Sequence, residues 1–294
     1  MCPVTDTNPG AGKNDAPKNS ARKVSRAADQ VSDKGAVKKE TAKKTAPKKD
    51  AAKARSVSDP SAQSNRGFLW ALLALLLIVA AVIAYIVWSG RGAQLDKIAE
   101  HKEEVSFTAT EKDDSYVELK SDKAAKDAKT VDLYEDFSCP HCADLAKATD
   151  DQMKDAIDKG DLIVNVHHLN FLDGQDYGTN TGHSTRALAA THVLAKNGET
   201  DAWWSLRKYL LENQDDAYSW EAKDFAEAAK AFGADGESVS EIKDGNLSEA
   251  QDVAENNAKK LDEQTGNVSS PRVLVDGKDM DIQNPMDWVK EATK

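Results

Sequence analysis

Residues 68–88 form a continuous apolar run, "FLWALLALLLIVAAVIAYIVW", whereas the rest of the chain mixes apolar and polar positions. The run has 21 residues and no charge. A helix of that length reaches about 31 Å, which matches a hydrocarbon core of about 30 Å. A buried core helix is disfavoured because a soluble helix keeps a polar face. A cleaved signal peptide is disfavoured because its apolar region is shorter and nearer the N-terminus. We expect one transmembrane helix, over residues 67–89.

Beyond residue 113 the pattern becomes that of an α/β domain. Three runs rich in β-branched and aromatic residues predict strands, and they read "YVEL", "TVDLYEDF" and "DLIVNVHHLNF". Between the second and third runs, a helix is predicted from Pro140 to Lys159 and is ended by Gly160. Four helical segments follow, near residues 183–196, 201–213, 219–232 and 247–262. A strand in "SSPRVLVDGK" and a helix that begins near Pro285 close the chain.

Charge divides the chain at the apolar run. Residues 1–66 contain 15 Lys or Arg and 7 Asp or Glu, and almost no large apolar residues. We therefore expect a disordered basic tail there. The remaining residues carry a net charge of −19. Residues 90–113 are interpreted as a polar stalk, and residues 114–294 as the folded domain with a helical insertion at about 180–265.

The basic excess on the N-terminal side of the apolar run predicts the orientation. Lys and Arg are retained on the cytoplasmic side, so the folded domain is expected outside the cytoplasm and the tail inside. The chain would then be a single-pass protein of the cell membrane, in contact with the bilayer through Phe68–Trp88. The favoured role of the tail is a topology signal and tether. Non-specific binding to anionic lipid or nucleic acid is the alternative, although nucleic acid is not expected as a partner.

Two of the three cysteines stand together in "TVDLYEDFSCPHC", Thr130–Cys142. A strand that runs into C-x-x-C at a helix start is typical of a redox pair. Cys139 would lie at the helix N-terminus, where unpaired N–H groups favour a thiolate, and Pro140 suits the first helical position. Cys142 follows one turn later and can close a disulfide. His141 is expected to stabilise the Cys139 thiolate and so to make the pair more oxidising.

Two other roles for the cysteine pair are disfavoured. A zinc half-site needs two further ligands, and the adjacent His167 and His168 should point to opposite faces of a strand. We therefore expect no metal. A structural disulfide over so short a loop would constrain the unfolded chain little. The redox-active disulfide Cys139–Cys142 is itself the expected reactive group, with no cofactor.

The "CPHC" motif after "YEDF", the helical insertion and Ser270-Pro271 before "RVLVDG" together resemble the DsbA-like branch of the thioredoxin fold, over roughly residues 115–294. The membrane-anchored layout resembles the actinobacterial, MdbA-like type. The resemblance implies a cis bond before Pro271 and substrate binding to the backbone of Ser270. The buried acid that such proteins often carry six residues before the first cysteine is replaced here by Leu133. Asp132 and Asp136 are near but out of register, and Glu135 is our candidate proton acceptor for Cys142.

These features predict an extracytoplasmic thiol–disulfide oxidoreductase that introduces disulfides into exported proteins. The expected partners are unfolded exported chains with cysteines and, from the resemblance, a quinone-coupled membrane protein that reoxidises the pair. A reductase or isomerase is one alternative, and a non-catalytic peptide-binding or chaperone module of thioredoxin fold is the other. Among further residues, His183 and Ser184 are expected to cap a helix. Trp203, Trp204 and Trp220 are expected to pack between helices.

Overall fold

A computed structural model describes residues 66–294, so the predicted tail lies outside the described residues except for Arg66. The strands are β1 (Thr108–Lys112), β2 (Tyr116–Lys120), β3 (Lys129–Asp136), β4 (Leu162–Leu169), β5 (Arg272–Val275) and β6 (Lys278–Asp279). The helices are α1 (Arg66–Ala99), α2 (Pro140–Lys159), α3 (His183–Lys196), α4 (Thr200–Glu212), α5 (Gln214–Ala217), α6 (Ala222–Ala231), α7 (Gly236–Asp244), α8 (Ser248–Thr265) and α9 (Trp288–Ala292), with the 3₁₀ turn η2 (Pro285–Asp287) before α9.

Helix α1 contains the predicted membrane span. It has 34 residues, and its most apolar window has a mean hydropathy of 2.9. The side chains of residues 68–86 are exposed to the surroundings, which is the opposite of a core helix. By length and composition, α1 is able to cross a membrane.

The predicted polar stalk at residues 90–113 is wrong in part. Helix α1 continues to Ala99, where Ile98 is only 3% exposed, and Arg91 pairs with Asp224 of α6 at 2.9 Å. Leu95 packs against the same core, and the two apolar side chains share one helix face at a spacing of three residues. Strand β1 then pairs with β2. The folded domain therefore begins well before residue 114.

The domain is built on one six-stranded sheet in the order β1-β2-β4-β3-β5-β6. The pair β3–β4 is parallel, and the other neighbours are antiparallel. Strand β3 is covered on both faces, because Val131 and Leu133 belong to the main core and Tyr134 packs in a smaller core with Leu261 of α8. The sheet thus carries a helix layer on each side, as in mixed α/β folds.

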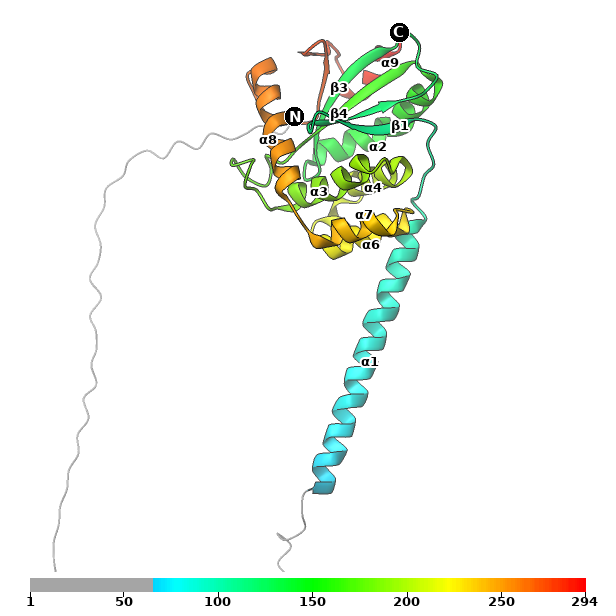
Figure 1. Cartoon of the computed structure of the whole chain (residues 1–294), viewed down its shortest axis with the longest axis vertical. Coiled ribbons are helices and arrows are strands. Elements are labelled where there is room, and N and C mark those ends of the chain that lie inside the picture. The colour runs from blue at the N-terminus through cyan, green and yellow to red at the C-terminus, as the bar shows by residue number, and fades with distance from the viewer. Residues whose placement is uncertain (1–65) are drawn as a thin grey trace, which may run out of the picture. The chain divides into compact units, whose positions relative to one another are not determined.

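The helical insertion stacks on the sheet through α4. In Figure 1, α3 and α4 lie next to the sheet layer, and α6 and α7 lie farther from it. Trp203 and Trp204 of α4 are fully buried, and Trp220 is 5% exposed, so these side chains pack between helices as expected. The predicted insertion is confirmed, but α7 was not predicted as a separate helix.

A buried ion-pair cluster fastens the insertion to the sheet. Arg207 of α4 donates to both carboxylate oxygens of Glu135 in β3, at 2.7 and 2.6 Å, and to Asp150 of α2 at 2.8 Å. All three side chains are at most 3% exposed. Removing one partner of such a cluster leaves an uncompensated buried charge, at a cost of about 3–5 kcal/mol. The cluster therefore fixes α2, α4 and β3 relative to one another.

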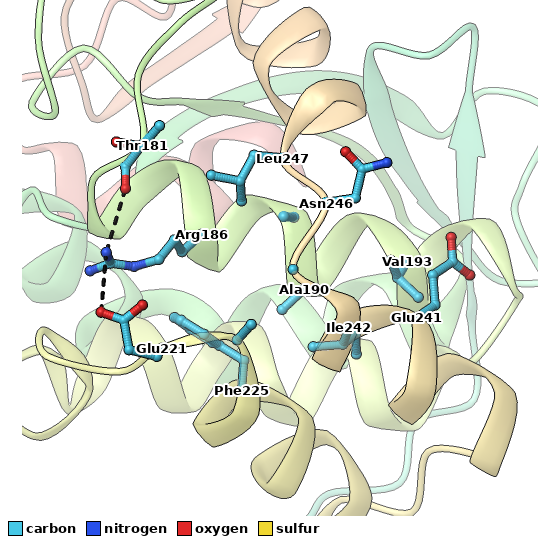
Figure 2. Close-up of a pocket in the computed structure, with 13 residues that line it drawn as sticks. Thr181, Arg186, Ala190, Val193, Glu221, Phe225, Glu241, Ile242, Asn246 and Leu247 are labelled. Atoms are coloured by element: carbon cyan, nitrogen blue, oxygen red, sulfur yellow. Dashed lines mark hydrogen bonds and ion pairs between the residues drawn. The ribbon is translucent and has the colours of Figure 1, made fainter.

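The insertion also encloses a pocket of about 310 Å³ between α3, α6, α7 and the turn before α8. Figure 2 shows Arg186 at the edge of the pocket, where its side chain donates a hydrogen bond to the Thr181 carbonyl and forms an ion pair with Glu221. The apolar side chains that line the pocket include Phe225 and Ile242. Neither cysteine of the C-x-x-C motif lines this pocket. It is a feature of the insertion, separate from the redox pair.

Candidate redox site

Cys139 lies at the junction between β3 and α2. It is the N-cap of α2, and its backbone N–H donates to the Asp136 carbonyl at 2.9 Å. Pro140 occupies the first helical position, where its missing N–H leaves no hydrogen bond unmade. The predicted strand-to-helix junction is therefore present, and Cys139 lies at the positive end of the helix dipole.

The loop before β5 meets Cys139 from a distant part of the chain. The Ser270–Pro271 bond is cis, as the resemblance implied. Cys139 Sγ lies 3.6 Å from the Ser270 carbonyl oxygen. Strand β5 pairs with β3, and that pairing carries the proline loop to the end of the strand that leads into the motif. The structure thus brings Ser270 and Pro271 to the cysteine pair.

Cys139 is 0% exposed in this conformation, although a cysteine that reacts with a substrate needs an accessible sulfur. Ser270 is also fully buried. A substrate sulfur therefore has access to Cys139 only after a local movement of the groups that cover it.

The surroundings of Cys142 oppose the ionisation of its thiol. The Asp136 backbone N–H donates to Cys142 Sγ at 3.5 Å, and the residue is 2% exposed. Burial raises the pKa of the Cys142 thiol well above its ordinary value, and the adjacent charge of Cys139 raises it further. In the reduced pair, Cys142 therefore holds its proton more firmly than an ordinary thiol.

His141 faces solvent in the first turn of α2. Its side chain is 55% exposed, and Nδ1 lies 4.0 Å from Asp144 Oδ2. The imidazole is thus next to Cys139 in the chain and outside the buried core of the site. This position allows it to act on the charge of Cys139 without being fixed by packing.

Glu135 does not fit the predicted role of proton acceptor. Although burial opposes its ionisation, Arg207 and His168 lower the pKa of Glu135 to about 2. His168 Nε2 lies 3.1 Å from Glu135 Oε1, and both carboxylate oxygens are engaged by Arg207. A carboxylate held so firmly in its charged form is a weak base. Its contacts are those of the structural cluster.

Asp136, the next residue, is the buried acid that the motif spacing did not identify. It is 0% exposed and accepts hydrogen bonds from Ser138 N at 2.9 Å, Leu172 N at 3.2 Å and the Ser184 hydroxyl. Burial raises the pKa of Asp136 to about 7, against the effect of these donors. Ser184 was expected to cap a helix, but Asp173 caps α3 by accepting from the N–H groups of Ser184 and Thr185.

Gln214 is a second residue that the sequence did not indicate. Its side-chain amide donates to the carbonyl oxygens of Phe137 at 2.7 Å and Cys139 at 3.0 Å. Gln214 begins α5, so the insertion holds the backbone of the motif directly. The Cys139 carbonyl also accepts from the backbone N–H groups of Cys142 and Ala143 in the first turn of α2.

Metal ligands do not gather at the motif. Within residues 66–294, no group of three or more His, Cys, Asp or Glu side chains could hold a metal ion. His167 instead contacts Asn257 and Asp132, at 3.1 and 3.0 Å, while His168 lies against Glu135. The two histidines serve different polar networks in the described domain.

Comparison with known proteins places this geometry in a family. Residues 122–293, more than half of the chain, match the Thioredoxin_4 family, described as thioredoxin. The structure matches MdbA, described as a thiol–disulfide oxidoreductase, from Corynebacterium diphtheriae with 44% identity and a TM-score of 0.62. That match covers 67% of this chain and 98% of the other. MdbA from Corynebacterium matruchotii matches with 42% identity and a TM-score of 0.62, over 68% of this chain and 98% of the other.

A curated relative shares part of the domain. The serine/threonine-protein kinase PknE of Mycobacterium tuberculosis is 30% identical over 138 residues, which are 45% of this chain. The chain spans only 24% of the kinase's length. The family match at residues 122–293 includes the redox motif and the cis-proline strand, and the two MdbA structures agree with it at more than 40% identity, so the chain belongs to the thioredoxin family, in its DsbA-like branch of MdbA type.

Proposed function

We propose that this chain is a membrane-anchored thiol oxidase that introduces disulfides into exported proteins through Cys139 and Cys142. The observation that carries the proposal is the position of Cys139, at the N-terminus of α2 with Sγ 3.6 Å from the Ser270 carbonyl beside cis-Pro271. The similarity to two proteins described as thiol–disulfide oxidoreductases supports the same chemistry.

The reaction begins with the pair as a disulfide. A substrate thiolate attacks Cys139 Sγ, the Cys139–Cys142 bond breaks, and a mixed disulfide forms between the substrate and Cys139. A second substrate thiolate then attacks the substrate sulfur of that mixed disulfide and releases Cys139 as a thiolate. The substrate loses two electrons, and the pair gains them. Ser270 and Pro271 would bind the substrate backbone beside Cys139, as a form of strand addition.

The direction of transfer follows from the charge of the reduced pair. The N-terminus of α2 and the imidazole of His141 favour the Cys139 thiolate, which exists only after reduction. Stabilising the reduced form makes the disulfide a stronger oxidant. A reductase or isomerase would need a pair that stays reduced, so the oxidase reading is preferred.

Reoxidation requires an external acceptor. The only other cysteine in the sequence is Cys2, on the far side of the apolar run, so this chain has no second thiol pair to take the electrons. We propose a quinone-coupled membrane protein as the acceptor. The anchor would hold the domain near that partner and near chains that emerge from the membrane.

The orientation can be checked with a surface cysteine. Tyr218 is 65% exposed, so Tyr218→Cys in a chain without its natural cysteines gives one accessible thiol in the domain. A membrane-impermeant maleimide added to intact cells should label this variant and leave a variant that retains only Cys2 unlabelled. Labelling of Cys2 alone would reverse the proposed topology.

Substitution of each cysteine in turn distinguishes an oxidase from a peptide-binding module. In Cys142→Ser, Cys139 can form a mixed disulfide that no internal thiol resolves, so reducible adducts with exported proteins should accumulate. In Cys139→Ser the adducts should disappear, because the raised pKa of Cys142 keeps its thiol protonated. Neither variant should oxidise a reduced, unfolded test protein. If both variants sustained secretion and folding like the parent chain, the peptide-binding module would replace the oxidase.

The role of His141 predicts a change in redox equilibrium. His141→Ser removes an imidazole that is 55% exposed and should leave the core packed. The thiolate of Cys139 then loses a stabilising neighbour, and the equilibrium with glutathione should move toward the disulfide by about tenfold, or about 30 mV. Lys154→Ala is the control. It removes a partly exposed ion pair with Asp158 on the same helix and should leave the redox potential unchanged. If the redox potential of the His141→Ser variant is unchanged or more positive, the helix terminus alone determines the potential.

A further inference from the structure

The pocket between α3, α6 and α7 has the dimensions of a ligand site. Its volume is about 310 Å³, at the lower end of the range of about 300–1,000 Å³ that ligand pockets occupy. Figure 2 shows that its wall is largely apolar, with Ala190, Val193, Phe225, Ile242 and Leu247 among the side chains that line it. A space of this size admits a short peptide segment and is small for a large cofactor.

Arg186 is the basic side chain among the described residues that line the pocket. Its side chain is 24% exposed, and Nη1 donates to the Thr181 carbonyl at 3.4 Å. Its Nε is buried and has no hydrogen-bond acceptor within residues 66–294. The guanidinium, which carries five N–H donors, can therefore turn toward a ligand without losing a hydrogen bond at Nε. A carboxylate is the group that such a fork binds best.

Glu221 neutralises Arg186 only loosely. The distance from Glu221 Oε1 to Arg186 Nη1 is 3.6 Å, which is too long for a hydrogen bond, and the Glu221 side chain is 72% exposed. An exposed pair of this kind is weak, so the carboxylate of a ligand can take the place of Glu221. In Figure 2, Glu241 lies at the opposite end of the pocket from Arg186. An acidic group is therefore favoured at the Arg186 end alone.

The pocket lies within reach of the redox motif along the chain that leads into α3. Thr181 lines the pocket, and Ser184 follows it by three residues. The Ser184 hydroxyl lies 2.7 Å from the hydroxyl of Ser138, which immediately precedes Cys139. These steps add up to roughly 20 Å, and an extended chain covers that distance in about six residues.

Tyr218 offers an exposed aromatic surface next to both places. Its side chain is 65% exposed, and its ring centroid lies 5.6 Å from that of His183. The His183 ring in turn stacks on Phe225 of the pocket, with centroids 6.0 Å apart. Tyr218 also directly follows α5, whose first residue, Gln214, donates to the Cys139 carbonyl. An unfolded chain can therefore contact protein between the redox pair and the pocket.

We propose that this pocket binds an acidic residue and the apolar residue beside it in an unfolded substrate, about six residues from the cysteine that reacts with Cys139. The carboxylate pairs with Arg186 in place of Glu221, and the apolar side chain packs against Phe225 and Ile242. This role rests on the proposed function, because the occupant is a substrate chain. The binding itself needs no thiol.

Binding can be measured without thiol chemistry. The full chain with Cys2→Ser, in detergent micelles and labelled at isoleucine and valine methyl groups, is titrated with two capped peptides that lack cysteine. One contains an aspartate–leucine pair, and the other has asparagine in place of aspartate. The aspartate peptide should shift the methyl signals of Ile242 and Val193 and bind about tenfold more tightly, because only it makes charge-assisted hydrogen bonds with Arg186. Acetate at the same concentrations should leave these signals in place.

Two variants test the assignment of the cation. Arg186→Gln should lower the affinity for the aspartate peptide about tenfold, to that for the asparagine peptide. Lys223→Gln makes the same change of charge on α6, outside the pocket, in a pair with Glu227 where the lysine is 51% exposed. It should bind both peptides as the parent chain does.

Three results would overturn the proposal. They are equal affinity of the parent chain for the two peptides, which needs no variant to fold, parent-like binding by Arg186→Gln, and shifts with acetate equal to those with the aspartate peptide, which would indicate a site for any small carboxylate.

The proposed function is read separately, by mixing the oxidised chain with a reduced peptide that carries two cysteines, one of them six residues from the aspartate–leucine pair. Peptide binding without oxidation would contradict the oxidase and leave the pocket assignment standing. Oxidation at the same rate with and without the aspartate would support the oxidase and contradict the role of the pocket.

Discussion

The site depends on the N-terminus of one helix placed at the end of one strand. Strand β3 ends at Asp136, and Cys139, three residues later, is the N-cap of α2, which begins at Pro140. Backbone N–H groups without helical partners surround that position and favour negative charge there. The second cysteine, one turn farther along, is held in the core as a thiol. In the proposed mechanism, the difference between the two environments determines which sulfur reacts first.

Two consecutive acidic residues at the end of β3 have different surroundings, because consecutive side chains of a strand point to opposite faces of the sheet. Glu135 points to the face where Arg207 and Asp150 form the buried ion-pair cluster, and its pKa falls to about 2. Asp136 points to the other face, where it has hydrogen-bond donors but no cation, and its pKa rises to about 7. One carboxylate therefore holds the insertion on the sheet through an ion pair, and the other is held in the core by neutral hydrogen-bond donors.

Local signals accounted for the part of the site that lies within a few residues of the motif. The strand, the C-x-x-C pair, Pro140 at the helix start and the proline before β5 could be read from adjacent residues, and the resemblance supplied the cis bond. The contacts that complete the site could not, because Ser184 and Gln214 reach the motif from 46 and 75 residues away. Sequence alone also could not show which acidic residue meets Arg207.

The same limit explains the error at the start of the domain. Residues 90–113 are rich in charges, which suggested a solvated stalk, but Leu95 and Ile98 form a short apolar stripe that packs on the core. Two apolar residues in a polar segment give a weak pattern, and only the partner surface on the insertion makes the stripe meaningful. The long apolar helix was predictable because its signal, 21 uncharged residues, is local and complete.

The redox potential of the Cys139–Cys142 pair tests the oxidase mechanism most directly. The full chain with Cys2→Ser would be equilibrated against glutathione buffers, and the fraction of disulfide measured by alkylation and mass spectrometry. A pair whose reduced form is stabilised at a helix N-terminus should have a potential more positive than about −200 mV. A value near that of thioredoxin, about −270 mV, would mean that the pair favours the disulfide too strongly to oxidise exported proteins, and would contradict the mechanism.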